Sequence, residues 1–479
     1  MDYNNYKPAI GLEIHVELAT KTKGFCGCLN KFGSHPNTNT CPVCLGLPGA
    51  LPVLNEQVVE LAVKAGLLLN CKIQKRSGFD RKNYFYPDLV KGYQITQYYQ
   101  PIAINGFLDF KTGGKDKRIK IERIHIEEDT GKALYQREGV LLDFNRSGVP
   151  LLEIVTAPDF NNAEEVKDFL ETLRLYLLHG EISHCKLEEG NMRIDVNISL
   201  ATEGTLGVKR EIKNLNSFTN VVKGINEELN RQIRNLTLKK EIKRETLKWD
   251  EEKNTLVTLR EKENPSNYMY FPEYDLPHIV LTEEYIQKIK DRLSKTPVEK
   301  ERELKKLGLA AEDVEFLIKD KDLLKLFDET VKYFNGAKEI VNIFKGDLTR
   351  YLKEQGKKLE DLNLDPQNFA STIEVLNSLQ YSNSIKRKIL FTYLEEGKEL
   401  KEILKLLNLK NSPADEEVLE VIKKVIEENP QGIVDYLEGK KKVVGYFMGQ
   451  IMKENKSFNP QKVEELLLSE LNNLNPPVL

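Results

Sequence analysis

The spacing of apolar residues changes once along this chain, and the change restricts the folds that it can adopt. Before about residue 290, apolar and polar residues alternate in segments such as GLEIHVEL and NMRIDVNISL. Such alternation is typical of strands with one buried face. From about Thr296 onward, apolar residues recur every three or four positions, which is typical of amphipathic helices. We therefore expect an N-terminal part built on a sheet and a C-terminal part that is entirely helical.

Helices interrupt the strands of the N-terminal part in no regular order. Asn55–Leu69 and Ala163–Leu178 show helical spacing, whereas RIKIERIHIEED alternates and changes phase at Glu122–Arg123, which predicts a β-bulge. Because no βαβ order is visible, an α+β fold with a mixed sheet is favoured over a doubly wound sheet. We expect a first domain at 1–294, a helical domain at 295–411 and a small α-helical tail domain at 412–479. The linker is expected at Asn411–Pro413.

Charge and composition exclude several classes of protein. The chain has 479 residues, with 71 basic and 74 acidic side chains and a formal net charge of −3, so any nucleic-acid-binding surface must be local. No apolar run approaches the roughly 20 residues needed to cross a bilayer, and the N-terminus lacks a secretory signal. We therefore expect a cytoplasmic protein with no membrane contact. All six cysteines and all six histidines precede residue 279, so we expect the chemistry in the first part of the chain.

Four of the cysteines form two close pairs, Cys26 with Cys28 and Cys41 with Cys44, separated by twelve residues that include Gly and Pro. Two such pairs can wrap four thiolates around one zinc ion. Because every thiol would be used, the metal would be structural and not catalytic. Four ordinary thiols are the alternative. Cys71 and Cys185 have no such neighbours and are expected to be ordinary buried thiols.

Acidic residues and one histidine occur on the polar faces and at the ends of several predicted strands. They are Glu13, His15, Glu17, Glu127, Glu128, Asp129, Glu153 and Asp195. Carboxylates with one imidazole suit Mg²⁺ or Mn²⁺ better than a soft metal. Salt bridges across the sheet, for example to Arg146 or Arg193, are the alternative. Spacing alone does not decide between them, because it does not show which strands are neighbours.

The segment Arg81–Gln100, RKNYFYPDLVKGYQITQYYQ, interleaves basic residues with tyrosines. Such a segment can hold phosphates and stack a base. It can also pack its rings inward or form an aromatic surface loop, and the residues alone favour this second interpretation. The chain has no P-loop, no GxGxxG after a strand, no GxSxG and no HExxH motif. Any nucleotide site must therefore be of another kind.

Taken together, the motifs resemble the B subunits of the tRNA-dependent amidotransferases. They run in the order of that family, cover nearly all of residues 9–278 and extend weakly to the C-terminus. They are GLEIHVELATKTKGFCGC, NTCPVCLGLPGALPVLN, FDRKNYFYPDLVKGYQITQ, HIEEDTGK, LDFNRSGVPLLEIV, RIDVNISL, REIKNLNSF, KWD and YFPEYDLP.

This resemblance implies an ATP-dependent carbon–nitrogen ligase. Its substrate would be the side-chain carboxylate of mischarged Glu-tRNA(Gln), Asp-tRNA(Asn) or both. ATP would phosphorylate that carboxylate, and ammonia from an amidase partner, the A subunit, would displace the phosphate after passing through an internal channel. A third and smaller partner, the C subunit, would complete the heterotrimer. The first domain would be a cradle with a zinc knuckle, and the helical and tail domains would grip the tRNA.

The resemblance also implies roles for individual residues. Mg²⁺ and ATP would lie at Glu13, His15, Glu128 and Glu153, with Glu127 and Asp195 beside them. Tyr84 and Arg146 are further expected contacts of ATP. The expected catalytic residues are Glu128, Glu153, Asp195, Lys82 and Lys91, and the two lysines fall where the ammonia channel ends. Zinc would be held by Cys26, Cys28, Cys41 and Cys44.

Two points stay open at this level. Lys440, Lys441 and Lys442 form the best local basic patch of the helical part and are our candidate tRNA contact, although a solvated charge run explains them equally well. The alternative for the whole chain is a non-catalytic tRNA-binding scaffold of the same complex. A cluster of carboxylates argues against the scaffold, because anions repel RNA.

Overall fold

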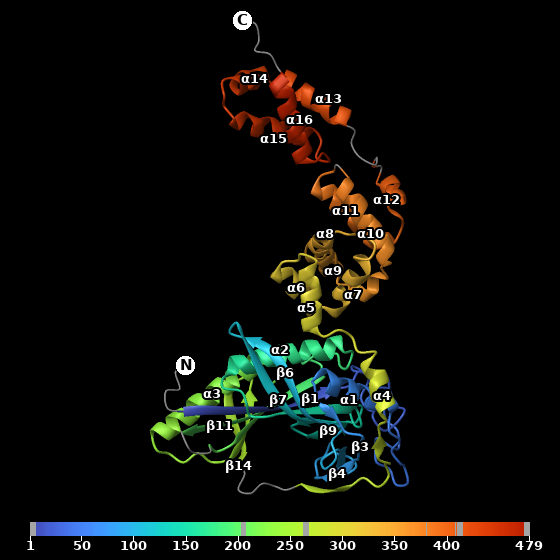
Figure 1. Ribbon diagram of the computed structural model, residues 1–479, viewed down its shortest axis with the longest axis vertical. Coiled ribbons are helices and arrows are strands. Elements are labelled where there is room, and N and C mark those ends of the chain that lie inside the picture. Colours follow the sequence, from blue (N-terminus) through green and yellow to red (C-terminus); the bar gives the residue numbers. More distant parts are fainter. Residues whose placement is uncertain are drawn as a thin grey trace. The chain divides into compact units, whose positions relative to one another are not determined.

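The computed structural model describes residues 6–202, 207–261, 268–379, 381–407, 409 and 415–473. The chain divides into two compact units, Met1–Glu299 and Lys300–Leu479. The first combines a large sheet with helices and the second is built from helices, which confirms the predicted α+β fold class (Figure 1). The expected linker at Asn411–Pro413 lies outside the described residues. The division of the helical part at residue 411 therefore stays a prediction.

The first unit is built on a mixed sheet, which has nine strands within the described ranges. In spatial order these are β14 (Thr255–Glu261), β13 (Glu245–Asp250), β12 (Arg210–Lys213), β11 (Met192–Thr202), β1 (Tyr6–Glu17), β10 (Pro150–Thr156), β7 (Lys115–Glu128), β6 (Ala103–Thr112) and β2 (Lys72–Ile73). All neighbouring pairs are antiparallel except β12 with β13.

One face of this sheet is apolar and is covered by helices. The predicted alternation of β1 is confirmed, because Leu12, Ile14 and Val16 are at most 1% exposed while Glu13 and His15 lie on the other face. Three helices pack against this apolar face (Figure 1). They are α1 (Glu56–Leu68), α2 (Ala163–His179) and α3 (Phe218–Thr237). The first two match the helices predicted from sequence.

The predicted bulge also forms. Val155 of β10 pairs with Arg123 and Thr156 pairs with Ile121, so Glu122 is the extra residue of β7. A bulge keeps the apolar side chains on both sides of it facing the same way although the residue count changes by one. Ile121 and Ile124 are accordingly both buried in the core.

Smaller sheets and two more helices complete the first unit. A three-stranded sheet contains β15 (Met269–Pro272), β4 (Asp80–Asn83) and β5 (Tyr93–Thr96), and β5 packs beside β7. Two further antiparallel pairs form two-stranded sheets. One joins β3 (Arg76–Ser77) with the distant β16 (Ile279–Val280), and the other is a hairpin of β8 (Lys132–Gln136) and β9 (Gly139–Asp143). The helices are α4 (Glu283–Lys290) and α5 (Pro297–Lys306), of which α5 continues into the second unit.

The second unit consists of short amphipathic helices. They are α6 (Ala311–Lys319), α7 (Lys321–Thr330), α8 (Ala337–Ile343), the π-helix η1 (Phe344–Leu348), α9 (Thr349–Gln355), the 3₁₀ helix η2 (Leu359–Leu362), α10 (Pro366–Ser378), α11 (Asn383–Glu396), α12 (Leu400–Leu406), α13 (Asp415–Glu427), α14 (Pro430–Leu437), α15 (Lys442–Glu454) and α16 (Pro460–Asn473). Helices α13, α15 and α16 enclose an apolar core of their own. In the part of the chain that the structure describes, no helix has both the length and the apolar character required to span a bilayer.

Candidate active site

The polar face of the large sheet carries the predicted acidic residues in register. His15 of β1 pairs with Glu153 of β10, and Glu153 pairs with His125 of β7. Two residues along the same face, Glu13 pairs with Asp195 of β11. Side chains directly opposite each other on one face of a sheet lie about 5 Å apart. The strand order therefore gathers groups that are far apart in the sequence.

These groups line a cavity of about 330 Å³ between the polar face and the three-stranded sheet. Lys82 of β4, Thr96 of β5 and Tyr270 of β15 contribute from the smaller sheet. The large sheet contributes carboxylates and basic side chains, namely Glu13, His15, Arg123, His125, Glu127, Glu153, Asp195, Glu211 and Lys213. The cavity thus combines opposite charges at close range and has aromatic rings on its far side.

One imidazole and two carboxylates meet in this cavity. The Nε2 atom of His15 lies 3.3 Å from Oε1 of Glu127 and 3.6 Å from Oε2 of Glu153. One ligand atom from each of the three lies within 4.8 Å of the others. This donor set fits a hard divalent cation such as Mg²⁺ or Mn²⁺.

The two carboxyls of this trio differ in acidity. Burial raises the pKa of Glu127 above its ordinary value. Burial also acts to raise the pKa of Glu153, but the nearby charges of His125 and His15 and a hydrogen bond with His125 outweigh it and hold that pKa well below its ordinary value. Neighbouring carboxyls whose pKa values are driven apart are typical of functional sites.

A second trio, Glu13, Asp195 and Glu211, also has ligand atoms within 4.8 Å of one another. Here Lys213 already supplies positive charge, because its Nζ atom lies 2.7 Å from Asp195 Oδ2 and 2.9 Å from Glu211 Oε1. Asn197 donates a hydrogen bond of 2.8 Å to Glu13. Asp195 and Glu13 therefore line the cavity, but they lie beside the histidine-containing trio and not within it.

Glu128 lies on the opposite side of β7 from Glu127, because consecutive residues of a strand face opposite ways. Its carboxylate accepts hydrogen bonds from the Lys91 ammonium and, at 2.9 Å, from the backbone N–H of Ile95. Lys91 and Glu128 line a second cavity of about 250 Å³. The structure thus brings Glu127 to His15 and Glu153, where the sequence interpretation placed Glu128.

Lys82 and Tyr84 lie close to aromatic rings. The Lys82 Nζ atom lies 4.8 Å from the centre of the Tyr268 ring and 5.8 Å from that of Tyr84. Tyr98 stacks on Tyr270 with 4.0 Å between the ring centres. Each interpretation of the segment Arg81–Gln100 therefore applies to part of it. Lys82 and Tyr98 line the larger cavity, whereas other aromatic residues of the segment are exposed, as in a surface loop.

Arg146 lies outside the residues that line the larger cavity. It donates hydrogen bonds to the carbonyls of Thr130, at 3.1 Å, and Gly131, at 2.8 Å, and its Nε atom lies 3.4 Å from Asp129. Arg193 also pairs with Asp129, at 2.9 Å. Both arginines therefore stabilise the turn that follows β7.

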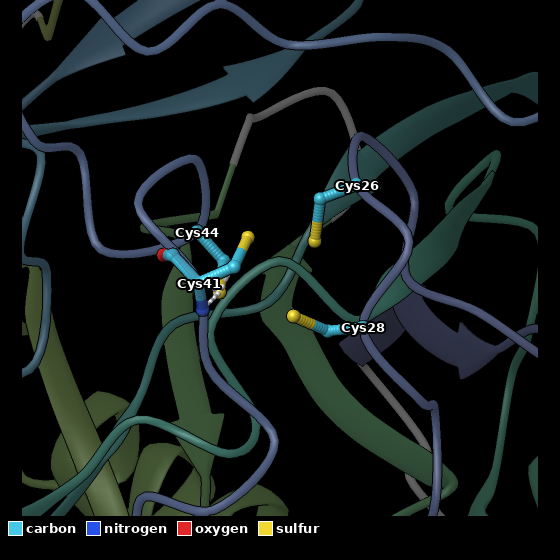
Figure 2. A group of neighbouring side chains, drawn as sticks. All are labelled: Cys26, Cys28, Cys41 and Cys44. Carbon is cyan, nitrogen blue, oxygen red and sulfur yellow. Dashed lines mark hydrogen bonds between the residues drawn. The ribbon is translucent and has the colours of Figure 1, made fainter.

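The four paired cysteines converge. Figure 2 shows the thiols of Cys26, Cys28, Cys41 and Cys44 pointing toward one another from two loop segments, and their sulfur atoms lie within 4.8 Å of one another. The sulfur atoms of Cys41 and Cys44 are 3.9 Å apart. Tetrahedral zinc with bonds of about 2.3 Å requires sulfur–sulfur distances of about 3.8 Å. The donor set and its spacing therefore fit zinc.

Acidity within the cysteine cluster is uneven. The pKa of Cys44 is lowered to about 4, chiefly because the Cys26 thiol hydrogen-bonds to it, with further contributions from the Cys41 backbone and the nearby Lys23 charge. The hydrogen bond to Cys44 raises the pKa of Cys26 well above its ordinary value, and burial raises the pKa of Cys28 to about 11. Zinc binds thiolates, so among these three cysteines Cys44 is the most readily available as a ligand at neutral pH. Cys71 and Cys185 are buried elsewhere.

In the helical unit, Lys440, Lys441 and Lys442 are exposed. Lys440 forms ion pairs of 2.9 Å with both Asp435 and Glu438. These acids reduce the positive potential of the patch.

Several residues of the site escaped the sequence interpretation. His125 was detectable, because it alternates with Glu127 on the same predicted strand and therefore shares its face. Lys213, Tyr268 and Tyr270 were not, because nothing in a single sequence shows that their strands approach β1 and β7.

The chain matches known protein families along most of its length. Residues 8–287 match the family model described as "GatB/GatE catalytic domain", and residues 325–471 match the one described as "GatB domain". A protein of Clostridium tetani, named as the B subunit of an aspartyl/glutamyl-tRNA(Asn/Gln) amidotransferase, is 44% identical over 98% of this chain and 100% of the relative. Identically named proteins of Caldicellulosiruptor bescii, at 44%, and Thermoanaerobacter, at 43%, match over 97% of this chain and 99% of their own lengths. The matches span both units, and the chain therefore belongs to the family of the B subunits of the tRNA-dependent amidotransferases.

Proposed function

We propose that this chain activates the side-chain carboxylate of Glu-tRNA(Gln), Asp-tRNA(Asn) or both with ATP and then amidates it with ammonia. The observation that carries the proposal is the His15–Glu127–Glu153 trio in a cavity that also contains basic side chains. A carboxylate and ATP are both anionic, so their reaction requires positive charge at the point of contact. A scaffold that only binds RNA would gain nothing from such a collection of acids.

The larger cavity is the proposed site of activation. A divalent cation held by His15, Glu127 and Glu153 would neutralise phosphate charge when bound. Lys82 and Lys213 lie in the same cavity and are available to hold phosphate oxygens. In this step an oxygen of the substrate carboxylate bonds to the γ-phosphorus of ATP, the bond to the bridging oxygen breaks, and ADP leaves. Both Glu-tRNA and Asp-tRNA carry the side-chain carboxylate that this step requires.

The smaller cavity is the proposed entry for ammonia. Nitrogen attacks the carbonyl carbon as neutral NH₃, the phosphate leaves with the electrons of the carbon–oxygen bond, and a proton is lost from nitrogen. The Glu128 carboxylate is placed to accept a proton from ammonium that enters this cavity, and Lys91 holds the carboxylate in position. We propose that an amidase partner supplies the ammonia through a channel and that a third, smaller partner completes the heterotrimer.

Zinc, tRNA binding and location complete the proposal. The four cysteines would hold a structural zinc ion. Residues Lys440 to Lys442 are a candidate tRNA contact of the helical unit. We place the complex in the cytoplasm, because thiols stay reduced there and the described cysteines are free.

The test uses the chain co-purified with the amidase and the small third partner, and it replaces glutamine with ammonium chloride so that the amidase is bypassed. Glu127→Gln should lower both tRNA-dependent ATP cleavage and Gln-tRNA or Asn-tRNA formation by about 100-fold or more, since it removes a carboxylate from the cation site. Glu128→Gln should retain ATP cleavage and lose amide formation.

Glu122→Gln is the matched control, because Glu122 lies exposed on the same strand. It should leave both reactions and the affinity for tRNA unchanged. Full activity of Glu127→Gln would show that activation does not take place in this cavity. If the unmodified complex bound tRNA but cleaved no ATP with either tRNA, the scaffold alternative would replace the proposal.

A further inference from the structure

Lys23 is completely buried, with an exposed fraction of 0%. Lysine is almost never buried to this extent unless its charge is compensated. An ammonium group that lacks an anionic partner in a protein interior is strongly unfavourable. The surroundings of Lys23 must therefore supply both hydrogen-bond acceptors and negative charge.

Three acceptors surround the Lys23 ammonium. Its Nζ atom donates to the carbonyl of Asn39 at 2.7 Å, to the carbonyl of Phe144 at 3.4 Å and to the sulfur of Cys44 at 3.6 Å. Within the described residues, no carboxylate forms an ion pair with Lys23. The carbonyls satisfy hydrogen bonds but carry no net charge, so Cys44 is the one group among these contacts that can carry a negative charge.

We infer that Lys23 is the buried counter-ion of the four-cysteine metal site. The inference rests on the proposed zinc. Four thiolates and one Zn²⁺ carry a net charge of −2, and a buried charge of this size needs compensation as much as the lysine does. Each group thus makes the burial of the other tolerable. Outer partners that hydrogen-bond to metal ligands commonly determine how tightly the metal is held.

The same lysine joins the cysteine loops to the loop that precedes β10. Besides the Lys23–Phe144 contact, Asn39 N–H donates to Asn145 at 2.8 Å, and Ser147 donates to the Cys44 carbonyl at 2.9 Å. Gly148 lies where these loops meet. A Cβ atom added at this glycine would be in van der Waals contact with all three neighbours, at 3.4 Å from Cys44 Cβ, 3.7 Å from Lys23 Cδ and 3.9 Å from a Glu128 oxygen. The metal site therefore supports one wall of the cavity that holds Glu128.

The experiment compares Lys23→Met with Lys21→Met in the full chain. Methionine keeps most of the length of lysine and removes the charge, and Lys21 is exposed two residues away. Zinc affinity is measured by competition with a chromogenic chelator, and melting temperatures are measured with and without zinc. Lys23→Met should weaken zinc binding by about 10- to 100-fold. Lys21→Met should match the wild type.

The melting temperatures separate charge compensation from packing. Lys23→Met should reduce the gain in melting temperature that zinc gives, and it should lower the melting temperature of the zinc-free protein less, because the metal-loaded cluster carries the larger negative charge. A lysine that only fills space would destabilise both forms equally. Wild-type zinc affinity with equal losses in both forms would overturn the inference.

Two other outcomes need separate measurements, namely a Lys23→Met variant that does not fold and a wild-type protein that binds no zinc. If Lys23→Met does not fold, Lys23→Gln retains hydrogen-bond donors without charge and Lys23→Arg retains the charge. Only Lys23→Gln should lose zinc affinity, and equal losses in both would overturn the inference. If the wild-type protein bound no zinc and gave no thiolate charge-transfer band with Co²⁺, the zinc proposal itself would fail, which is a distinct result.

Discussion

Breaking the Lys91–Glu128 ion pair should destabilise the first unit measurably. The side chains are only 10% and 5% exposed, so either charge left alone would be largely desolvated. Removing one partner of such a pair costs about 3–5 kcal/mol. Glu128→Gln leaves the Lys91 ammonium unpaired, and Lys91→Met leaves the Glu128 carboxylate with the Ile95 N–H as its remaining donor.

The expected shift follows from the size of the unit, Met1–Glu299. With an unfolding entropy of about 2.1 cal/mol/K per residue, this unit has an entropy change of about 0.63 kcal/mol/K. Each single variant should therefore lower the melting temperature by about 5–8 °C. The double variant Lys91→Met/Glu128→Leu removes both charges and should recover much of this loss, because an apolar pair of similar volume often replaces a buried ion pair without cost.

The chain provides its own probe for this assay. Trp249 is the one tryptophan of the sequence, and it is 4% exposed in β13 of the first unit. Its emission therefore reports the unfolding of this unit and not of the helical one. Asp109→Asn is the control, since the Asp109–Arg118 pair is more than half exposed and should contribute little. The reasoning is refuted if Glu128→Gln melts like Asp109→Asn, or if the double variant is less stable than both single variants.

Three further predictions concern other parts of the chain. His125→Gln should weaken Mn²⁺ binding by about 10- to 100-fold in calorimetric titration, because His125 Nε2 lies 3.1 Å from Glu153 and orients it, and unchanged affinity would contradict this role. Burial raises the pKa of Cys71 to about 12 and that of Cys185 to about 11. A thiol with a raised pKa stays protonated, so raising the pH from 7 to 9 should expose little thiolate at either residue, and alkylation followed by mass spectrometry should label them only in the unfolded chain. Deleting residues 413–479 should raise the KM for tRNA and leave ATP use largely intact, and an unchanged KM would exclude the tail as a tRNA contact.

The sequence was sufficient for the faces of individual strands. Alternation in β1 and β11 separated buried from polar positions, and the phase change at Glu122 located the bulge. Such local patterns are readable because a strand has a side-chain period of two. The four-cysteine cluster could also be predicted from the sequence, because its four ligands come from two short segments.

The sequence did not allow us to predict which residues line each cavity. The strand order that puts β1 between β10 and β11 depends on packing between distant segments, and so does the approach of Tyr270 to the acids. The ends of strands were a second difficulty. Glu127 and Glu128 are chemically identical neighbours, and only the register of β7 decides which of them meets His15.

The bulge in β7 determines which of Glu127 and Glu128 faces His15. Ile119 and Ile121 lie before it, Ile124 and Ile126 lie after it, and all four are buried in the same core. This is possible only because Glu122 adds one residue between the two pairs. With Ile126 on the core side, Glu127 must face the acidic cavity and Glu128 must turn back toward Lys91. The backbone of one strand thus holds the proposed activation site and the proposed ammonia entry in a constant relation, one residue apart on opposite sides of the sheet. The separation of the two half-reactions by Glu127→Gln and Glu128→Gln is therefore a test of strand register as much as of chemistry.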